Sequence, residues 1–293
     1  MTSKREQKIT NLSIYFLNEQ IPKELKDLTF DEFSTFSVCR SKDRVFVNLS
    51  KISHLNLFQK NYQLLIIGSA VANYFREGNF QIDYFGCKKT DVKNFLLGWE
   101  LAKYKFDKYK TNQKKNKHAK ISHKFQKEIK SFTESYSFIR DLINTPANFL
   151  GPNEILTATK KFLVNYKLVN IVSGEKLKKK FPLIFAVGQG AEESKKPLFC
   201  EFKLNKKRSN TKIFLIGKGV SFDTGGLNIK TGSGMALMKK DMGGAANSIG
   251  LAKLVDDFNL NVDLRLLLCL VENSISKKSI RPSDIIKSRE GSF

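Results

Sequence analysis

Residues 213–226 read IFLIGKGVSFDTGG, and residues 239–246 read KKDMGGAA. The first stretch begins with an apolar run, Ile213–Ile216, which predicts a buried strand, and it continues into a glycine-rich segment that we expect to form a loop. The second stretch leads into an amphipathic pattern that predicts a helix over residues 242–258. In open α/β sheets, ligands bind beyond the carboxyl ends of strands. The two stretches together therefore predict an α/β fold with its functional site at this point.

Four of the charged residues between Gly217 and Ala246 have chemistry that suits a divalent cation. Asp223 and Asp241 supply hard carboxylate oxygens, which such ions prefer. Lys218 can coordinate as a neutral amine or act as a fixed cation, and Lys230 adds a further charge. A plainer interpretation also exists, in which Asp241 caps a helix, Asp223 belongs to a turn and the lysines are solvated. A phosphate-binding loop is excluded, because neither GxxxxGK[ST] nor GxGxxG occurs here.

The rest of the chain alternates apolar runs with helical patterns. Leu64–Val71 and Leu264–Val271 are too short to span a bilayer and predict buried strands. Helical patterns cover residues 92–105, 132–142 and 154–166, the last with Asn153 as a cap. Further short apolar runs predict strands at Val169–Val172, Leu183–Val187 and Leu198–Phe202. Strands that alternate with helices indicate a mainly parallel sheet.

Three regions follow from changes in composition along the chain. Residues 1–105 predict a small N-terminal α/β domain. Residues 106–130 are dense in lysine and poor in large apolar side chains, which indicates a linker or a solvated helix. Residues 131–293 predict a larger α/β domain that contains the candidate site. The predicted fold class is thus α/β, with a small first domain and a larger second one.

Composition limits the class of protein. The chain of 293 residues is 41% hydrophobic and carries a formal net charge of +23. Its four scattered cysteines and the lack of an apolar signal region lead us to expect a cytoplasmic protein with no membrane association. The charge raises a nucleic-acid hypothesis. However, lysine is spread along the whole chain, so we expect sequence-independent attraction at most and treat nucleic acid as an unfavoured partner.

Residues 211–250 resemble the metal-binding segment of the M17 leucyl aminopeptidases, or cytosol aminopeptidases. That family's pattern is approximately GKGxxFDxGGxxxKxxxxMxxMxxDMxGAA, and this chain follows it without a gap. The resemblance extends to residues 140–148, to residues 271–273 and to residues 281–284. It covers about residues 130–293, and it implies a metallopeptidase domain that releases N-terminal amino acids, of leucine type, from peptides.

The resemblance also implies a role for each matching residue. Lys218, Asp223 and Asp241 correspond to ligands of two divalent metal ions, Mn²⁺ or Zn²⁺, with Asp223 bridging both. Lys230 corresponds to the catalytic lysine that stabilises negative charge on the scissile carbonyl. Met238 corresponds to a wall of the substrate pocket. The implied partners are peptides with a free N-terminus, and the implied assembly of a full-length member is a homohexamer.

One departure from the family pattern is large. M17 enzymes carry a later NTDAEGRL segment that supplies an Asp and a Glu to the metals and a catalytic Arg, and this chain contains no such string. We therefore expect a chain truncated within its catalytic domain, with weak metal binding and little or no activity. We also expect Leu264–Val271 to lie near an unprotected sheet edge, an aggregation hazard. The alternative is a non-catalytic binding module of the same fold, with nucleic acid as its candidate ligand.

Overall fold

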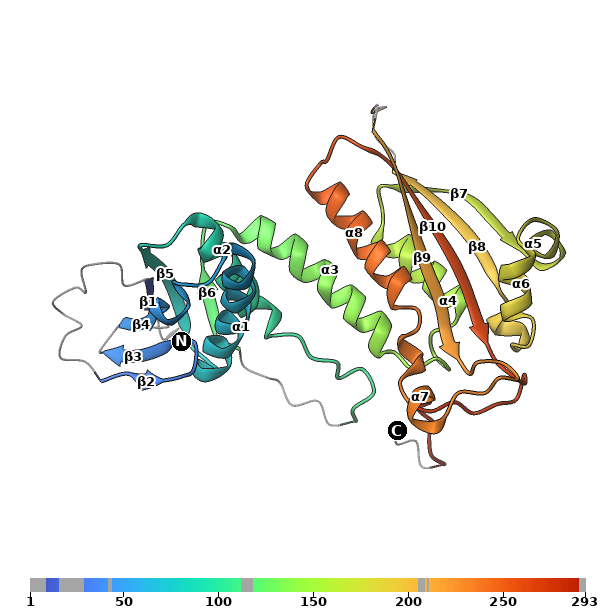
Figure 1. Ribbon diagram of the computed structural model, residues 1–293, viewed down its shortest axis with the longest axis horizontal. Coiled ribbons are helices and arrows are strands. Elements are labelled where there is room, and N and C mark those ends of the chain that lie inside the picture. The colour runs from blue at the N-terminus through green and yellow to red at the C-terminus, as the bar shows by residue number, and fades with distance from the viewer. Residues whose placement is uncertain are drawn as a thin grey trace, which may run out of the picture. The chain divides into compact units, whose positions relative to one another are not determined.

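The computed structural model describes residues 9–15, 29–41, 44–111, 118–204, 209 and 211–289, with only the backbone given for Ile9 and Tyr15 (Figure 1). These residues divide into two compact units. The first unit holds the chain up to Lys105 and the segment that ends at Thr133. The second holds the stretch that begins at Phe106 and everything from Glu134 onwards. No helix in the described part of the chain combines the length and apolar character needed to cross a bilayer.

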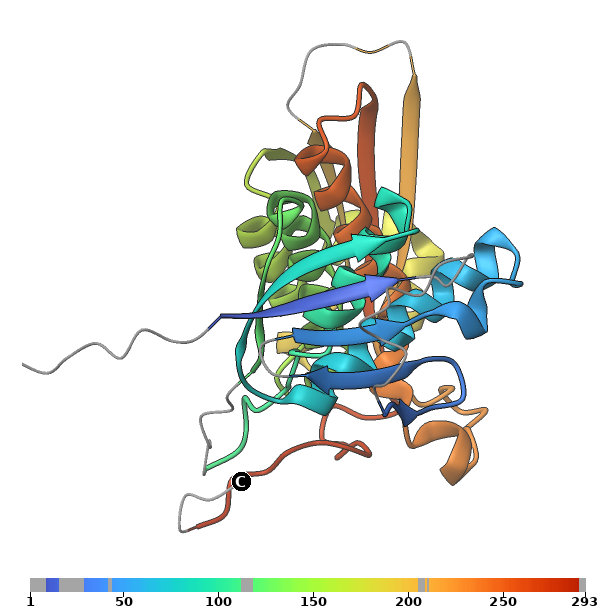
Figure 2. The ribbon, with the colours of Figure 1, turned by 90° about the vertical axis from the view of Figure 1, so that its left-hand side faces the viewer.

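The first unit is a sheet with two helices on one face (Figure 2). The strand order is β2-β3-β4-β1-β5-β6, parallel between β4 and β1, β1 and β5, and β5 and β6, and antiparallel from β2 to β4. Its elements are β1 (Ile9–Tyr15), β2 (Asp31–Glu32), β3 (Ser37–Ser41), β4 (Arg44–Asn48), the 3-10 turn η2 (Ser50–Ile52), α1 (Leu57–Phe75), β5 (Asn79–Phe85), α2 (Lys89–Leu101) and β6 (Lys120–Ser122).

The strand predicted at Leu64–Val71 is wrong, because these residues lie in the middle of α1. Their continuous apolar character comes from close packing between two helices. A Cβ atom added at Gly68 of α1 would lie 1.9 Å from the carbonyl oxygen of Phe95, and one added at Gly98 of α2 would lie 2.0 Å from that of Leu65. Glycines at the crossing let the two backbones touch, so the face of α1 that meets α2 is as apolar as a buried strand.

The second unit is a sheet with helices on both faces. The strand order is β7-β8-β10-β9. The C-terminal part of α3, α4 and α8 pack on one face, and α5 and α6 pack on part of the other. Its elements are α3 (Gln126–Asn144, shared with the first unit), α4 (Pro152–Phe162), β7 (Tyr166–Ser173), α5 (Gly174–Lys180), α6 (Pro182–Gly188), the 3-10 turn η3 (Glu193–Lys195), β8 (Leu198–Leu204), β9 (Lys212–Asp223), α7 (Gly232–Met235), the 3-10 turn η4 (Met238–Lys240), α8 (Gly243–Asp257) and β10 (Asp263–Asn273).

The predicted α/β class is confirmed, but this sheet is mixed rather than mainly parallel. β9 and β10 are parallel, whereas β8 runs antiparallel to both β7 and β10. The run Leu183–Val187 is not a strand, since it lies in α6, where Pro182 occupies the first turn and favours a helix start. Between β7 and β8 the chain passes through α5 and α6 and then returns antiparallel beside β7.

The strand predicted at Leu264–Val271 lies next to the edge strand of its sheet, as expected, but is not itself unprotected. These residues form β10, which is paired on both sides, with β8 and with β9. Four of its leucines, which point to the face covered by α8 and α4, are fully buried; they are Leu264, Leu266, Leu268 and Leu270. Full burial of a leucine side chain contributes about 2 kcal/mol, so this strand lies at the centre of the unit's core.

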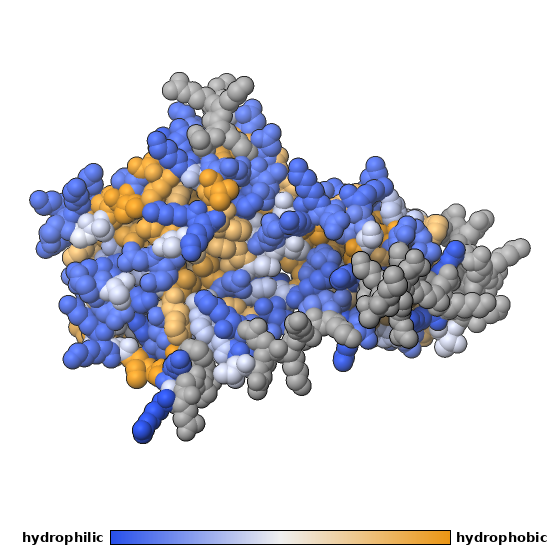
Figure 3. Space-filling view, turned by 180° about the vertical axis from the view of Figure 1, so that it is seen from behind, coloured by the Kyte–Doolittle hydropathy of each residue, from blue (hydrophilic) through white to orange (hydrophobic). Residues whose placement is uncertain are grey.

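Within the described residues, the strand at the edge of this sheet is β9, and only one of its faces is fully packed. Residues on its α8 side are half-buried or buried, whereas Phe214 and Ile216 on the opposite side are 57% and 69% exposed. The predicted buried strand over Ile213–Ile216 is therefore half-buried, because α5 and α6 pack over β8 and β10 and leave β9 open. Apolar residues gather in several patches among charged ones on the face drawn in Figure 3.

Candidate metal and catalytic site

The carboxyl end of β9 carries the first half of the candidate site. The strand continues to Asp223, so Gly217, Lys218 and Gly219 belong to the strand and not to the predicted loop. Pairing with β10 is regular up to Val220, and the register then shifts so that Asn273 lies opposite Asp223. Such a bulge bends a strand locally and changes the direction of its side chains. Asp223 is therefore presented by an irregular strand end and not by an ideal strand.

A tight turn follows Asp223 and uses backbone angles that favour glycine. Gly225 and Gly226 have φ values of +87° and +67°. A Cβ atom at Gly225 would lie 2.4 Å from the carbonyl oxygen of Asn228. The turn is closed by the N–H of Lys230, which donates to the carbonyl of Thr224 at 3.0 Å. The glycine pair thus lets the chain fold back so that Lys230 comes beside Asp223.

The Asp223 carboxylate is held on both of its oxygens. Oδ1 accepts the N–H of Gly225 at 3.0 Å and the side-chain amide of Asn273 at 2.7 Å, while Oδ2 lies 3.1 Å from Nζ of Lys230. Burial raises the pKa of this carboxyl, but the hydrogen bonds from Gly225, Lys230 and Asn273 outweigh burial, and the pKa lies below its usual value. The group is therefore ionised at neutral pH.

The second half of the site lies where η4 passes into α8. Asp241 lies between them together with Met242, as predicted from its place before the helical pattern. Its Oδ1 accepts a hydrogen bond from Nζ of Lys218 at 2.8 Å. The start of α8 lies against β9, because a Cβ atom at Gly244 would be 3.4 Å from the backbone of Lys218. The structure thus joins strand and helix through the Lys218–Asp241 ion pair.

Asp241 also has a polar atom that fits a cation. Its Oδ2 is buried and has no hydrogen-bond partner among the described residues. A buried carboxylate oxygen without a partner is costly, and a bound cation would satisfy it. The ligand types of Asp223, Asp241 and the amine of Lys218 suit a divalent metal ion. The number of ligands is small, since no group of three or more His, Cys, Asp or Glu side chains in the described chain is arranged to hold such an ion.

The predicted residues thus form two pairs, Lys218 with Asp241 and Lys230 with Asp223. The Lys218 side chain is 62% exposed and that of Lys230 is 34% exposed, so both ammonium groups face solvent in part. Met238 lies in η4, three residues before Asp241, and is partly exposed.

Sequence reasoning gave no role to Asn273, which touches Asp223 directly. Its only signal was membership of the short Val271–Asn273 match to the family. An amide that meets a carboxylate 50 residues away along the chain cannot be recognised from spacing alone.

The chain is similar to known proteins of one family. Residues 137–293 match the model of the cytosol aminopeptidase family, catalytic domain. A probable cytosol aminopeptidase of Phytoplasma mali is 30% identical over 240 residues, which is 76% of this chain and 48% of that protein. The crystal structure of a cytosol aminopeptidase from Coxiella burnetii matches with a TM-score of 0.73 and 30% identity, covering 99% of this chain and 64% of that one.

A third similarity concerns the fold alone. The bottromycin maturation enzyme BotP, solved in complex with Mn, matches with a TM-score of 0.72 at 19% identity, covering 97% of this chain and 64% of that one. This chain spans about half the length of the curated relatives it matches. Since the family model covers more than half of the chain, from the α3 helix through both halves of the candidate site, the chain belongs to the M17 cytosol aminopeptidase family.

Proposed function

We propose that this chain carries the amino-terminal part of the metal centre of an M17 aminopeptidase, which removes N-terminal residues, of leucine type, from peptides. One observation supports the proposal most directly. Two lysine–carboxylate pairs, Lys218–Asp241 and Lys230–Asp223, flank the end of β9, and Asp241 keeps a buried oxygen without a partner among the described residues. The family membership supports the same chemistry.

Lys218, Asp223 and Asp241 would hold the two divalent ions, Mn²⁺ or Zn²⁺. Such ions, when bound, supply Lewis-acid polarisation of a peptide carbonyl. The chain's own contribution is positional. Asp223 is fixed on Oδ1 by two donors. Lys230 presents a partly exposed ammonium that can stabilise the oxygen that becomes negative during hydrolysis. Met238 would line the pocket for the substrate's first side chain.

The substrate and setting follow from the same proposal. The substrates would be peptides with a free N-terminus, and the relatives' name, cytosol aminopeptidase, supports a cytoplasmic setting. A homohexamer is the assembly that the family resemblance implies for a chain with the whole catalytic domain. Because the sequence has no NTDAEGRL string, the 293 residues alone would hold metal weakly and would not hydrolyse peptides.

Calorimetric titration with Mn²⁺ tests the metal site. We expect the purified chain to bind Mn²⁺ weakly and Asp241→Asn to weaken binding at least about tenfold, because it removes a ligand charge. Asp263→Asn is a matched control, since its carboxylate is similarly buried but lies at the start of β10 and pairs with Lys203. Equal Mn²⁺ affinity in the wild type and Asp241→Asn would contradict the site.

A second assay tests the proposed inactivity. Leu-p-nitroanilide should remain uncleaved by the purified chain with or without added Mn²⁺, because the later carboxylates and arginine of the family pattern are missing from the sequence. Metal-dependent release of p-nitroaniline that survives repurification would show that 293 residues suffice for catalysis.

A further inference from the structure

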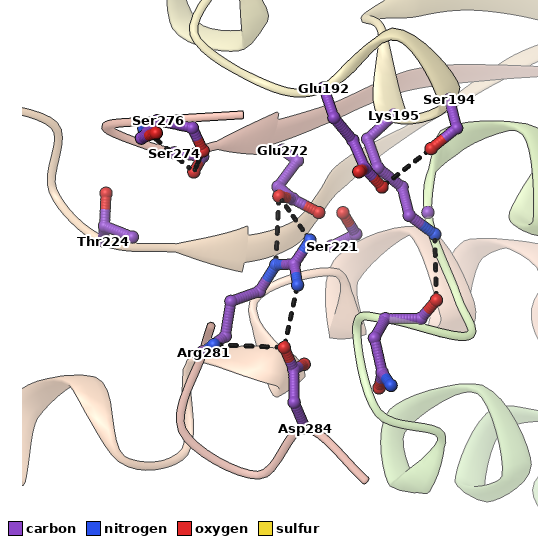
Figure 4. Close-up of polar contacts among 12 residues, drawn as sticks. Glu192, Ser194, Lys195, Ser221, Thr224, Glu272, Ser274, Ser276, Arg281 and Asp284 are labelled. Atoms are coloured by element: carbon purple, nitrogen blue, oxygen red, sulfur yellow. Dashed lines mark hydrogen bonds and ion pairs between the residues drawn. The ribbon is translucent and has the colours of Figure 1, made fainter. Parts of the chain in front are cut away.

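A buried ionic network joins the end of β10 to the loop that follows this strand (Figure 4). Glu272 in β10 is 1% exposed, and the side chains of Arg281 and Asp284 are 9% and 6% exposed. Nε of Arg281 donates to Oε1 of Glu272 at 3.0 Å, and Nη1 donates to Oδ2 of Asp284 at 2.8 Å. The backbone N–H of Arg281 donates to the same Asp284 oxygen at 3.0 Å. One arginine thus ties the end of β10 to the loop that follows it.

The same loop is attached to a second segment of the family pattern. The side-chain amide of Asn148, in the turn after α3, donates to the carbonyl of Ile285 at 2.8 Å. Lys195, which is 4% exposed, donates to the carbonyl of Asn148 at 3.4 Å and approaches Glu154 at 3.3 Å. The motif segments around residues 145–148, 271–273 and 281–284 therefore converge in one place, although none of them supplies a proposed metal ligand.

Asn273 follows Glu272 directly in the chain, at the end of β10. The carbonyl oxygen of Asn273 accepts two hydrogen bonds from Thr224, one from the backbone N–H at 3.0 Å and one from the side-chain hydroxyl at 2.9 Å. Its side-chain amide donates to Oδ1 of Asp223 at 2.7 Å. Backbone and side chain of one residue thus hold the turn and the carboxylate at the end of β9. Because the strand register shifts at this point, regular pairing alone does not fix Asp223.

We propose that Asn273 is a positioning residue for Asp223, and that the Glu272–Arg281–Asp284 network holds Asn273 in place. This inference rests on the proposed function, because it concerns the orientation of a metal ligand. With two donors on Oδ1, the carboxylate presents Oδ2 as the oxygen with free acceptor capacity toward a cation, where Lys230 now stands. Partners that orient a ligand in this way typically change metal affinity by about 10- to 100-fold.

The energetics of the network favour an orienting role over a stabilising one. Burying two carboxylates and a guanidinium costs desolvation free energy, and apolar residues of similar volume often serve stability equally well. Oε2 of Glu272 and Oδ1 of Asp284 are buried without partners among the described residues, so the network is not fully satisfied. What it does provide is a rigid, directional link from the loop to the strand end beside Asp223.

Titration with Co²⁺, followed by its visible absorption, tests the proposal on the 293-residue chain itself. We expect Asn273→Ala to weaken Co²⁺ binding about tenfold or more and to shift the absorption bands, with little change in the melting temperature, because the Asn273 carbonyl still holds the turn. The control, Asn165→Ala, removes a similar amide–carboxylate bond of 2.8 Å to Asp256 and should leave binding unchanged. Asp223→Asn should abolish binding.

A double-mutant cycle tests the second part of the proposal. Arg281→Lys keeps the charge but loses the planar fork, and it should weaken Co²⁺ binding several-fold. If Arg281 acts through Asn273, the double variant should bind no more weakly than Asn273→Ala alone. Additive losses would overturn the link between Arg281 and Asn273. If Asn273→Ala folds poorly, the Co²⁺ spectrum of Arg281→Lys alone tests the proposal.

Two failures remain distinguishable. If the wild type binds Co²⁺ and Asn273→Ala binds it equally well with the same bands, the positioning role is wrong while the metal site stands. If neither the wild type nor Asp223→Asn binds Co²⁺, the proposed metal site is wrong and the positioning role falls with it.

Discussion

At the residue scale, Asp223 carries the most structural information. It is the last residue of β9, its carboxylate has three charged or polar donors, and one of them, Asn273, comes from the neighbouring strand. The sequence could identify Asp223 and Lys230, because their spacing around two glycines is part of a long motif. It could not identify Asn273, because only the parallel pairing of β9 with β10 brings that amide to the carboxylate.

The lowered pKa of Asp223 predicts a pH-dependent contribution to stability. An aspartate in an unfolded chain has a pKa of about 3.9. Since the folded pKa is lower, the ionised group stabilises the fold above that value, and this contribution is lost as the pH falls through the folded pKa. In metal-free buffer, the wild type should therefore exceed Asp223→Asn in unfolding free energy at pH 7, and the gap should narrow below about pH 4.

Denaturant unfolding at a series of pH values, with EDTA present, measures that gap. The Asp263→Asn variant serves as the control for loss of a carboxylate elsewhere in the same sheet. A gap between the wild type and Asp223→Asn that stays constant from pH 7 to pH 3 would contradict the assigned hydrogen bonds.

At the element scale, short apolar runs did not distinguish strands from helices, and not all of them are buried: Leu183 in α6 and Ile216 in β9 are 82% and 69% exposed. The run Leu264–Val271 is a strand, as expected, whereas Leu64–Val71 and Leu183–Val187 lie in helices. A short run has the same composition in a buried strand and in a helix packed against another helix. Strand direction and strand order depend on contacts between distant segments. Sequence patterns could therefore not predict that the sheet is mixed or that β10 is paired on both sides.

The exposed face of β9 predicts self-association. Phe214 and Ile216 are exposed on a strand that forms the edge of its sheet in the described chain, and apolar edges pair readily with other chains. In analytical ultracentrifugation, the wild type should associate as its concentration rises. Ile216→Lys should shift this equilibrium toward the monomer. Leu227→Lys is the control, because Leu227 is 96% exposed but lies outside any strand. An equal effect of both substitutions would mean that the strand edge is not the cause.

At the scale of the whole molecule, membership of the M17 family rests on the second unit, where the long motif and the family model coincide. The first unit offered only composition and short runs to sequence reasoning, and its six-stranded sheet could not be drawn from them. The charge of +23 is spread over lysines along the chain, so it says more about solubility and non-specific attraction than about a specific partner.

The central claim is that Lys218, Asp223 and Asp241 hold metal. Anomalous diffraction from crystals of the chain soaked in Mn²⁺ tests it most directly, because it locates the ion without relying on activity. We predict an anomalous peak at the end of β9, bounded by the carboxylates of Asp223 and Asp241. A well-diffracting soaked crystal whose Mn²⁺ peaks all lie elsewhere, with the Lys218–Asp241 pair intact, would contradict the claim.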